Sequence, residues 1–313
     1  MSIARTAPAV SVVIPTRNRP RQVVRAVRSV VAQTLSDLEI LVVDDASTDD
    51  VGAALASLAE PRLRVLRHDR RRGACAARNT GIADARGRFV ALLDDDDEWM
   101  PAKLAAQVAR FAASPEDVGL VYCGTEVVSE ATGEVQRRSV PSGMPLAYAE
   151  LLRSTGFGAS AALVRRECLA AVGGFDETLA GAQDRDMWLR IAKRYRLDYV
   201  PEALVRWYIH GEQITANLAV KITARRQLLR KYADDLRRHP AALARLLLSL
   251  GMMYGADARP APAAWCFLRA IRRSPRDPAA YRHLARLLGS RARYRIWVRE
   301  AGFENVGGIS LYY

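Results

Sequence analysis

Short apolar runs alternate with helix-forming segments from residue 10 to residue 93, and this alternation is the strongest constraint on the fold. Each apolar run is short and rich in Val, Ile or Leu, as expected of a strand buried on both faces of a parallel sheet. The four runs are VSVVIP (10–15), LEILVVDDAS (38–47), LRVLRH (63–68) and GRFVALL (87–93). The segments between them, 21–33, 51–59 and 74–85, predict helices; in the first of these, valines recur at helical spacing. The order predicts an α/β fold, a Rossmann-like, mostly parallel sheet with flanking helices.

The pattern changes after residue 115. GLVYCGTEVVS (119–129) predicts a strand, SAALVRREC (160–168) a strand leading into a helix, 184–195 a helix and 197–210 an extended segment. From about residue 215 the chain is rich in Ala, Leu and Arg and is punctuated by prolines, which predicts an all-α C-terminal extension. Within it, residues 263–289 have the spacing of a tetratricopeptide-like helix pair.

Charge is distributed unevenly along the 313 residues. Residues 1–218 hold 28 basic and 28 acidic side chains, whereas residues 219–313 hold 19 basic and 6 acidic ones, so the net charge of +13 lies in the C-terminal third. Such asymmetry favours a second partner for this region, either an anionic membrane surface or nucleic acid. Arginine-rich solvated helix faces would give the same composition.

No run approaches the roughly 20 apolar residues that span a bilayer. The most apolar segment, 243–256, is shorter and contains Arg245. The N-terminus lacks a signal-peptide layout, and the four cysteines are scattered without metal-ligand spacing, which is typical of a reducing compartment. We therefore expect a cytoplasmic protein.

Carboxylates gather where two predicted strands end. Asp44 and Asp45 close the second strand, and the four residues Asp94 to Asp97 follow the fourth. Ligands of doubly wound folds bind beyond the carboxyl ends of the strands. Because adjacent carboxylates repel one another, we expect a bound cation to offset their charge at this edge.

Four segments in order carry a family resemblance: SVVIPTRNRP, ILVVDDASTDD, GACAARNTGIADARGRFVALLDDDDEWMP and GGFDETLAGAQDRDMWLRI. Together they resemble the family 2 glycosyltransferases over about residues 9–215, leaving the C-terminal third outside the match. The resemblance implies a GT-A fold and a nucleotide-diphospho-sugar substrate. It also implies two regions, a GT-A glycosyltransferase domain over 1–215 and a basic helical region over 216–313.

The resemblance aligns the aspartate run with the family's DXD motif. It implies Asp94 and Asp96 as metal ligands, with Asp96 binding directly, and Asp95 directed at the ribose. Mg²⁺ or Mn²⁺ suits such a site because both ions prefer carboxylate oxygens and neutralise the charge of a leaving diphosphate. Four consecutive aspartates leave the register open, and the alternative is a solvated acidic turn.

Further family elements imply nucleotide contacts. The resemblance gives Asp45 the role of hydrogen-bond acceptor for a nucleobase N–H, which implies a UDP-sugar. Pro15, Thr16 and Arg17 follow the first strand and would border the base or the phosphates. Arg78, in AARNTG, is expected to contact phosphate; its alternatives are a surface position or pairing with the aspartates.

Three residues close to Asp45 are given structural interpretations. Asp44 and Ser47 are expected to cap the following helix. Ala46 stands where glycine is commoner in the family, so this turn is expected to need no positive φ.

The resemblance maps Asp184 onto the family's catalytic base, which removes the proton of the attacking acceptor hydroxyl. Positions 184, 188, 191 and 195 share one helical face with apolar neighbours, so we expect Asp184 to point inward. Capping of the helix is the alternative for Asp184 and the preferred interpretation for Asp186. His210, in WYIHGEQIT, is a candidate third metal ligand or phosphate donor, with a structural role as its alternative.

The implied activity is inverting, metal-dependent transfer from a nucleotide-sugar to a hydroxyl of a glycan or lipid-linked acceptor, in bacterial surface polysaccharide synthesis. The basic helical region would then contact the inner membrane face, and nucleic acid is not the expected partner. A nucleotidyltransferase is disfavoured because the PTRNRP loop contains no glycine. An inactive sugar-nucleotide-binding module with a helical interaction domain is the alternative from another class.

Overall fold

The structure is a computed structural model that describes residues 7–154, 156–209 and 217–300. It divides into two compact units. The sheet unit comprises 1–147, 157–177 and 190–210, and the helical unit comprises 148–156, 178–189 and 211–313. The domain boundary predicted between residues 215 and 216 lies outside the described residues.

The sheet unit is built on one sheet with the strand order β3-β2-β1-β4-β8-β6-β9-β5, and β7 pairs with β6. Its first four strands are parallel neighbours. They are β1 (Val10–Thr16), β2 (Leu38–Asp44), β3 (Leu63–Arg67) and β4 (Phe89–Leu92). Buried side chains alone line β1, β2 and β4, which is why their sequences are mostly apolar runs.

The second half of the sheet is mixed. Strand β8 lies antiparallel between β4 and β6, whereas β6 and β9 are parallel. These strands are β5 (Asp97–Trp99), β6 (Val118–Ser129), β7 (Val135–Ser139), β8 (Ala162–Arg165) and β9 (Arg196–Ile209). The α/β fold class is confirmed, with the parallel pattern concentrated in the first four strands. The sequence did not predict β5.

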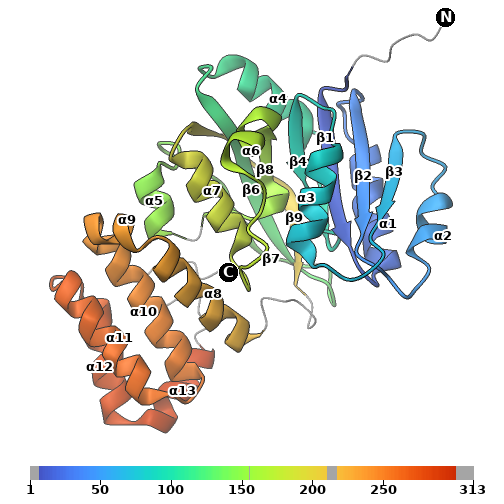
Figure 1. Cartoon of the computed structure of the whole chain (residues 1–313). Helices are drawn as coiled ribbons and strands as arrows, with labels where there is room; N and C mark the ends of the chain where they lie inside the picture. Colours follow the sequence, from blue (N-terminus) through green and yellow to red (C-terminus); the bar gives the residue numbers. More distant parts are fainter. Residues whose placement is uncertain (1–6, 155, 210–216, 301–313) are drawn as a thin grey trace, which may run out of the picture. The chain divides into compact units, whose positions relative to one another are not determined.

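Helices flank the sheet, and Figure 1 shows α3 passing in front of β1 and β2. Gly81 on α3 permits this close approach, because a Cβ there would collide with Val13 of β1. The helices of the sheet unit are α1 (Pro20–Val31), α2 (Val51–Ala56), α3 (Ala74–Asp84), α4 (Lys103–Ala113) and α6 (Arg166–Val172). A short 3-10 turn, η1 (Ala159–Ala161), precedes β8.

The helical unit has its own core around α10, whose side chains are buried along nearly its whole length. Its helices are α5 (Tyr148–Arg153), the start of α7 (Gln183–Ala192), α8 (Leu218–Lys231), α9 (Ala233–Arg238), α10 (Pro240–Ala256), α11 (Pro260–Arg273), α12 (Pro278–Gly289) and α13 (Arg291–Glu300). Gly251 and Gly255 allow Phe267 and Tyr294 to pack against the backbone of α10. The two helices predicted within 263–289 are present as α11 and α12.

None of the helices among the described residues has the length and apolarity to cross a bilayer. All four cysteines are buried, and none forms a disulfide. They therefore serve as small core side chains, as the sequence predicts.

Candidate active site

The parallel strands bring the predicted donor-binding residues to one edge of the sheet. Thr16 at the end of β1 is in register with Asp44 at the end of β2, and Asp45 N donates to Thr16 O at 2.9 Å. The aspartate run follows β4, and Asp97 is the first residue of β5. We call this the donor edge and define it by Thr16, Asp44, Asp45 and Asp94 to Asp97.

Arginine offsets the repulsion within the aspartate run. Arg19 Nη1 donates to Asp95 Oδ1 at 3.0 Å and to Asp96 Oδ2 at 2.9 Å. Thr16 Oγ1 donates to Asp95 Oδ2 at 2.7 Å, and Arg25 Nη2 donates to the backbone oxygen of Asp96 at 2.7 Å. Burial and the charge of Asp96 nevertheless raise the pKa of Asp95 to about 6, so the acidic charge is only partly compensated.

Arg78 on α3 provides a second clamp on the run. Its Nη2 donates to Asp94 Oδ1 at 2.5 Å, and its guanidinium lies 5.4 Å from the centre of the Phe175 ring. The side chain is buried, so Arg78 does not occupy the surface position that the sequence left open. In this structure Arg78 is instead a partner of the aspartate run, which is the other alternative that the sequence left open.

Asp97 is the least compensated of the four aspartates. Its Oδ2 accepts a hydrogen bond from Ser160 Oγ, and no group in the described part of the chain is bonded to its buried Oδ1. Burial, followed by the charges of Asp96 and Asp94, raises the pKa of Asp97 well above its ordinary value. A cation close to this cluster would stabilise the ionised form of the buried Asp97 carboxylate.

The donor set fits Mg²⁺ or Mn²⁺. Among the described residues, no three His, Cys, Asp or Glu side chains are gathered as a closed metal cage. Such a cage is not required, because Mg²⁺ is commonly held by one or two carboxylates together with substrate phosphates. Asp94, with a side chain 32% exposed, and Asp96, at 14%, offer hard oxygen ligands at the accessible side of the run.

Asp45 is heavily hydrogen-bonded. Its Oδ1 lies 2.8 Å from His68 Nδ1 and accepts from Arg72 N at 2.7 Å, while its Oδ2 accepts from Gly73 N at 2.7 Å. Burial raises the pKa of Asp45, but these bonds outweigh burial and hold the pKa below its ordinary value. Asp45 is therefore an ionised acceptor that fixes the 68–73 segment. His68, which sequence reasoning missed, could have been found as the residue that follows β3 at the same edge.

The interpretations of the turn at Ala46 and of Asp44 as a helix cap were wrong. Ala46 has φ +56°, so the turn does adopt the left-handed region despite lacking glycine. Asp44 accepts from Ser47 N at 2.9 Å and from Arg67 Nη1 at 3.0 Å, whereas Asp50 caps α2 through Ala53 N. The Asp44 carboxylate therefore closes the turn itself, since its bond to Ser47 spans three residues.

The residues after β1 lie at this edge as well. Pro15 is buried within β1, and Arg17 directly follows the strand. Arg17 Nε is buried and has no hydrogen-bond partner within the described residues. A donor of hydrogen bonds is thus left for a ligand at this position.

The predicted catalytic base lies in the helical unit. Asp184 is in the first turn of α7 and is 5% exposed, which matches its place on the predicted inward face. Asp186 is fully buried, accepts from Tyr232 Oη at 2.8 Å and lies 2.7 Å from Lys231 Nζ. Asp186 therefore anchors the end of α8 and is not a simple first-turn carboxylate. His210 lies outside the described residues.

Comparison with known proteins shows which family this chain resembles. The sequence profile of glycosyl transferase family 2 matches residues 11–173. The WcaA protein of Escherichia coli K12, named for colanic acid biosynthesis, is 31% identical over 236 residues, covering 72% of this chain and 82% of that protein. WfgD of Escherichia coli, named as a UDP-Glc:alpha-D-GlcNAc-diphosphoundecaprenol beta-1,3-glucosyltransferase, is 29% identical and covers 59% of this chain and 70% of its own length.

Solved structures share the fold. A mannosyltransferase from Pyrobaculum calidifontis, in complex with GDP-Man and Mn²⁺, superposes with a TM-score of 0.62 at 24% identity, covering 96% of this chain and 85% of that one. TarS of S. aureus in complex with UDP-GlcNAc gives 0.59 at 16% identity, covering 90% and 91%. The profile match over more than half of the chain, joined to the GT-A fold, identifies this chain as an enzyme of glycosyltransferase family 2.

Proposed function

We propose that the chain is an inverting, metal-dependent glycosyltransferase that uses a UDP-sugar. The acceptor is a hydroxyl of a glycan or of a lipid-linked sugar, and the product belongs to bacterial surface polysaccharide. The observation that carries this proposal is the donor edge, where four aspartates and three arginines converge on the ends of β1 and β4. Ligands of such sheets bind beyond the carboxyl ends of the strands.

Different residues at the donor edge bind different parts of the nucleotide-sugar and the metal ion. Asp45 accepts the imide N–H of uracil with an ionised carboxylate, Asp95 contacts the ribose, and Pro15 and Thr16 border the base. Arg17 and Arg78 donate to the diphosphate, for which a planar guanidinium is well matched. Asp94 and Asp96 hold Mg²⁺ or Mn²⁺, which when bound neutralises charge on the leaving diphosphate.

Asp184 acts as the general base. Its carboxylate accepts the proton of the acceptor hydroxyl as that oxygen attacks the anomeric carbon, and UDP leaves from the opposite face. One displacement inverts the anomeric configuration, so no covalent sugar–enzyme intermediate forms. Asp184 is 5% exposed, so its carboxylate is withdrawn from bulk water.

The acceptor and location follow from the relatives and from charge. WcaA is named for colanic acid, and WfgD for a diphosphoundecaprenol-linked acceptor. The 19 basic and 6 acidic residues after position 218 suit an anionic membrane surface. We infer a cytoplasmic enzyme that contacts the inner face of the membrane through its basic helical unit, with nucleic acid not a partner.

Release of UDP from UDP-sugars, measured with Mn²⁺ and with EDTA, tests the proposal. We expect slow Mn²⁺-dependent hydrolysis, because water can replace the acceptor, and a loss of at least 100-fold in Asp184→Asn. Arg138→Gln, a surface change, is the matched control and should keep the wild-type rate. UDP-sugar binding without turnover would instead identify an inactive binding module.

A further inference from the structure

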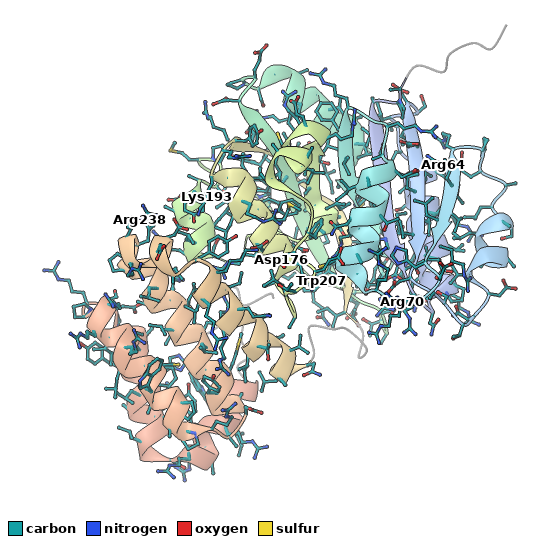
Figure 2. The ribbon with its side chains drawn as sticks, in the orientation of Figure 1. Arg64, Arg70, Asp176, Lys193, Trp207 and Arg238 are labelled. Atoms are coloured by element: carbon teal, nitrogen blue, oxygen red, sulfur yellow. The ribbon has the colours of Figure 1, made fainter. Side chains whose placement is uncertain are left out.

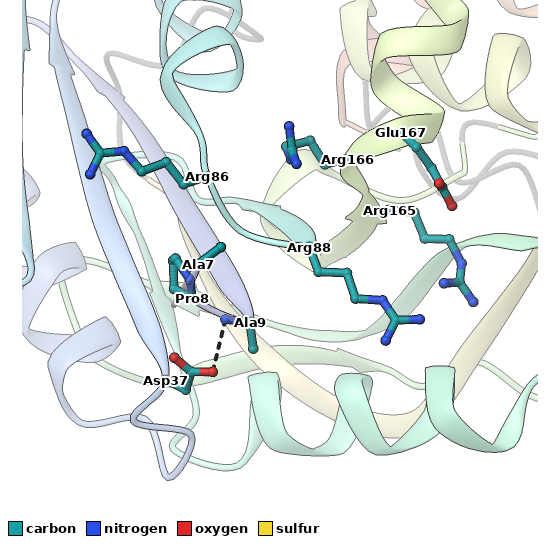
Figure 3. A pocket seen from close by; sticks show the side chains of 9 residues that line it. All are labelled: Ala7, Pro8, Ala9, Asp37, Arg86, Arg88, Arg165, Arg166 and Glu167. Atoms are coloured by element: carbon teal, nitrogen blue, oxygen red, sulfur yellow. Dashed lines mark hydrogen bonds between the residues drawn. The ribbon is translucent and has the colours of Figure 1, made fainter. Parts of the chain in front are cut away.

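A basic hollow lies at the edge of the sheet opposite the donor edge. It has a volume of about 490 Å³ and lies where β1 and β4 begin and β8 ends (Figure 3). Its lining comprises Ala7, Pro8, Ala9, Asp37, Arg86, Arg88, Arg165, Arg166 and Glu167. β1 is seven residues long, so it separates the hollow from the donor edge by about 23 Å at the usual rise per residue.

The backbone and the Phe89 ring fix two of these arginines. Arg88 directly precedes Phe89 of β4, and Arg165 faces Phe89 across the β4–β8 ladder. Their guanidiniums lie 5.3 and 5.9 Å from the centre of the Phe89 ring. Arg165 Nε also donates to Val118 O at 2.7 Å, which orients its guanidinium and leaves the terminal nitrogens for another acceptor.

The other two arginines add positive charge nearby. Arg166 Nε donates to Gly87 O at 2.9 Å, and Arg86 is exposed. Figure 3 shows Arg88 and Arg165 extending to the same side of the strands, whereas Arg86 and Arg166 extend away from them. Arg88 and Arg165 therefore form the core of the site.

No carboxylate neutralises this cluster within the described residues. Of the two acids in the lining, Asp37 accepts from Ala9 N at 3.1 Å, and Glu167 is exposed and lies beyond ion-pair distance of all four arginines. By contrast, Arg64 of β3, labelled in Figure 2, pairs with both Glu39 and Asp84. The hollow is thus lined by four cationic side chains that have no carboxylate partner among the described residues.

We propose that the hollow binds a phosphate group, with Arg88 and Arg165 as its two principal ligands. Arginine forks match phosphate oxygens and form stronger, charge-assisted bonds with them. The same chemistry is offered by a phospholipid headgroup and by a free phosphorylated metabolite. Because of its distance from the donor edge, this site is separate from the diphosphate position of the nucleotide-sugar.

Calorimetric titration of the full-length protein with inorganic phosphate, in EDTA and at low ionic strength, tests the site. EDTA removes divalent cations, so the donor edge remains acidic and repels the anion. We expect saturable binding that weakens at least tenfold in the double variant Arg88→Gln/Arg165→Lys. Arg165→Lys keeps the charge but loses the fork, so it should weaken binding by itself.

Arg138→Gln/Arg196→Gln is the control, because it removes two positive charges whose side chains are 62% and 65% exposed elsewhere on the sheet unit. It should change the dissociation constant less than twofold. Arg88→Gln keeps the test valid if the double variant fails to fold, since the Arg88 side chain forms no hydrogen bond with any residue that the structure describes. Absence of saturable phosphate binding, or equal weakening in the control, would overturn the proposal.

Vesicle flotation distinguishes the two sources. Vesicles of phosphatidylcholine with phosphatidic acid are compared with phosphatidylcholine alone. Loss of at least fivefold in vesicle binding for Arg88→Gln, relative to wild type, assigns a headgroup. Unchanged vesicle binding together with weakened phosphate binding assigns a soluble phosphate compound. Either result supports a phosphate site. If Arg88→Gln changes the binding of neither phosphate nor vesicles, the proposal is contradicted.

Discussion

The two edges of the sheet carry charges of opposite sign, and these charges are balanced by neighbouring side chains to different degrees. At the donor edge, Asp94, Asp95 and Asp96 each lie within 3.0 Å of an arginine nitrogen. At the opposite edge, Arg88 and Arg165 have aromatic and backbone neighbours and no carboxylate partner among the described residues. One edge therefore carries partly compensated anions, and the other carries cations that have no carboxylate partner in the described part of the chain.

The difference separates two kinds of binding site. At the partly compensated donor edge, a cation must compete with Arg19 and Arg78 for the aspartates, so binding of metal and of diphosphate is expected to be coupled. At the opposite edge, no carboxylate among the described residues competes with an incoming anion for Arg88 and Arg165. Substitutions at the two edges are therefore expected to change stability by different amounts and in opposite directions.

The largest effect is expected from Asp96→Asn. An amide keeps the shape of the side chain but supplies no negative charge to the cation, so the Mn²⁺-dependent rate should fall by about 100-fold or more. Initial rates of UDP release at saturating UDP-sugar provide the measurement. A rate within threefold of wild type would remove Asp96 from the metal site and favour another register of the aspartate run.

The second prediction concerns pH. The pKa of Asp95 is about 6 in the folded protein, against about 3.9 when unfolded. Between these two pH values the folded state therefore binds more protons than the unfolded state. Its free energy of unfolding falls as pH rises through that window. In EDTA, the free energy of unfolding of wild type relative to Asp95→Asn should fall by about 2 kcal/mol from pH 4 to pH 7.

Denaturant unfolding at several pH values measures this difference. Asp117→Asn, at a side chain that is 59% exposed, should run parallel to wild type. A wild-type curve parallel to that of Asp95→Asn would show that Asp95 has an ordinary pKa and that its charge is fully compensated.

Removing the clamp itself should have a smaller effect. Arg19→Gln leaves Asp95 and Asp96 facing each other, at a partly buried position, so the metal-free protein should lose about 1–2 kcal/mol of stability. Saturating Mn²⁺ should recover part of that loss, because the cation replaces the lost positive charge. Thermal unfolding with and without Mn²⁺ tests this, and an equal loss in both conditions would count against competition between Arg19 and metal.

The smallest effect is expected at the basic edge. Arg86→Gln and Arg88→Gln remove charges that have no ion-pair partner among the described residues, so stability should change by less than about 0.5 kcal/mol. The direction should be toward higher stability, because like charges are separated. Loss of more than about 1 kcal/mol would reveal a stabilising partner and would break the contrast between the edges.

Much of the sheet unit was predictable from sequence because its strands are buried on both faces. Continuous apolar runs marked β1, β2 and β4, and helical spacing marked α1. Three-residue β5 was missed because it begins with a carboxylate and is too short to show a period. The positive φ of Ala46 was missed because the residue type argues against it.

The candidate site was predictable only as a set of residues at strand ends. Register along a parallel sheet predicts that Thr16, Asp45 and the aspartate run meet at one edge. The partner of each carboxylate depends on tertiary contacts, and so the Arg19 clamp and the bond between Asp45 and His68 were not foreseen. The basic hollow joins residues 86–88 to 165–167, which adjoin only through the antiparallel β4–β8 pair.

Binding of a nucleoside diphosphate at the donor edge is proposed to depend on a divalent cation. Calorimetric titration of UDP into wild type and Asp96→Asn, each with Mn²⁺ and with EDTA, tests it most directly. We expect Mn²⁺ to tighten UDP binding at least tenfold in wild type and not in Asp96→Asn. Failure of wild type to bind any nucleoside diphosphate with any divalent cation would contradict it.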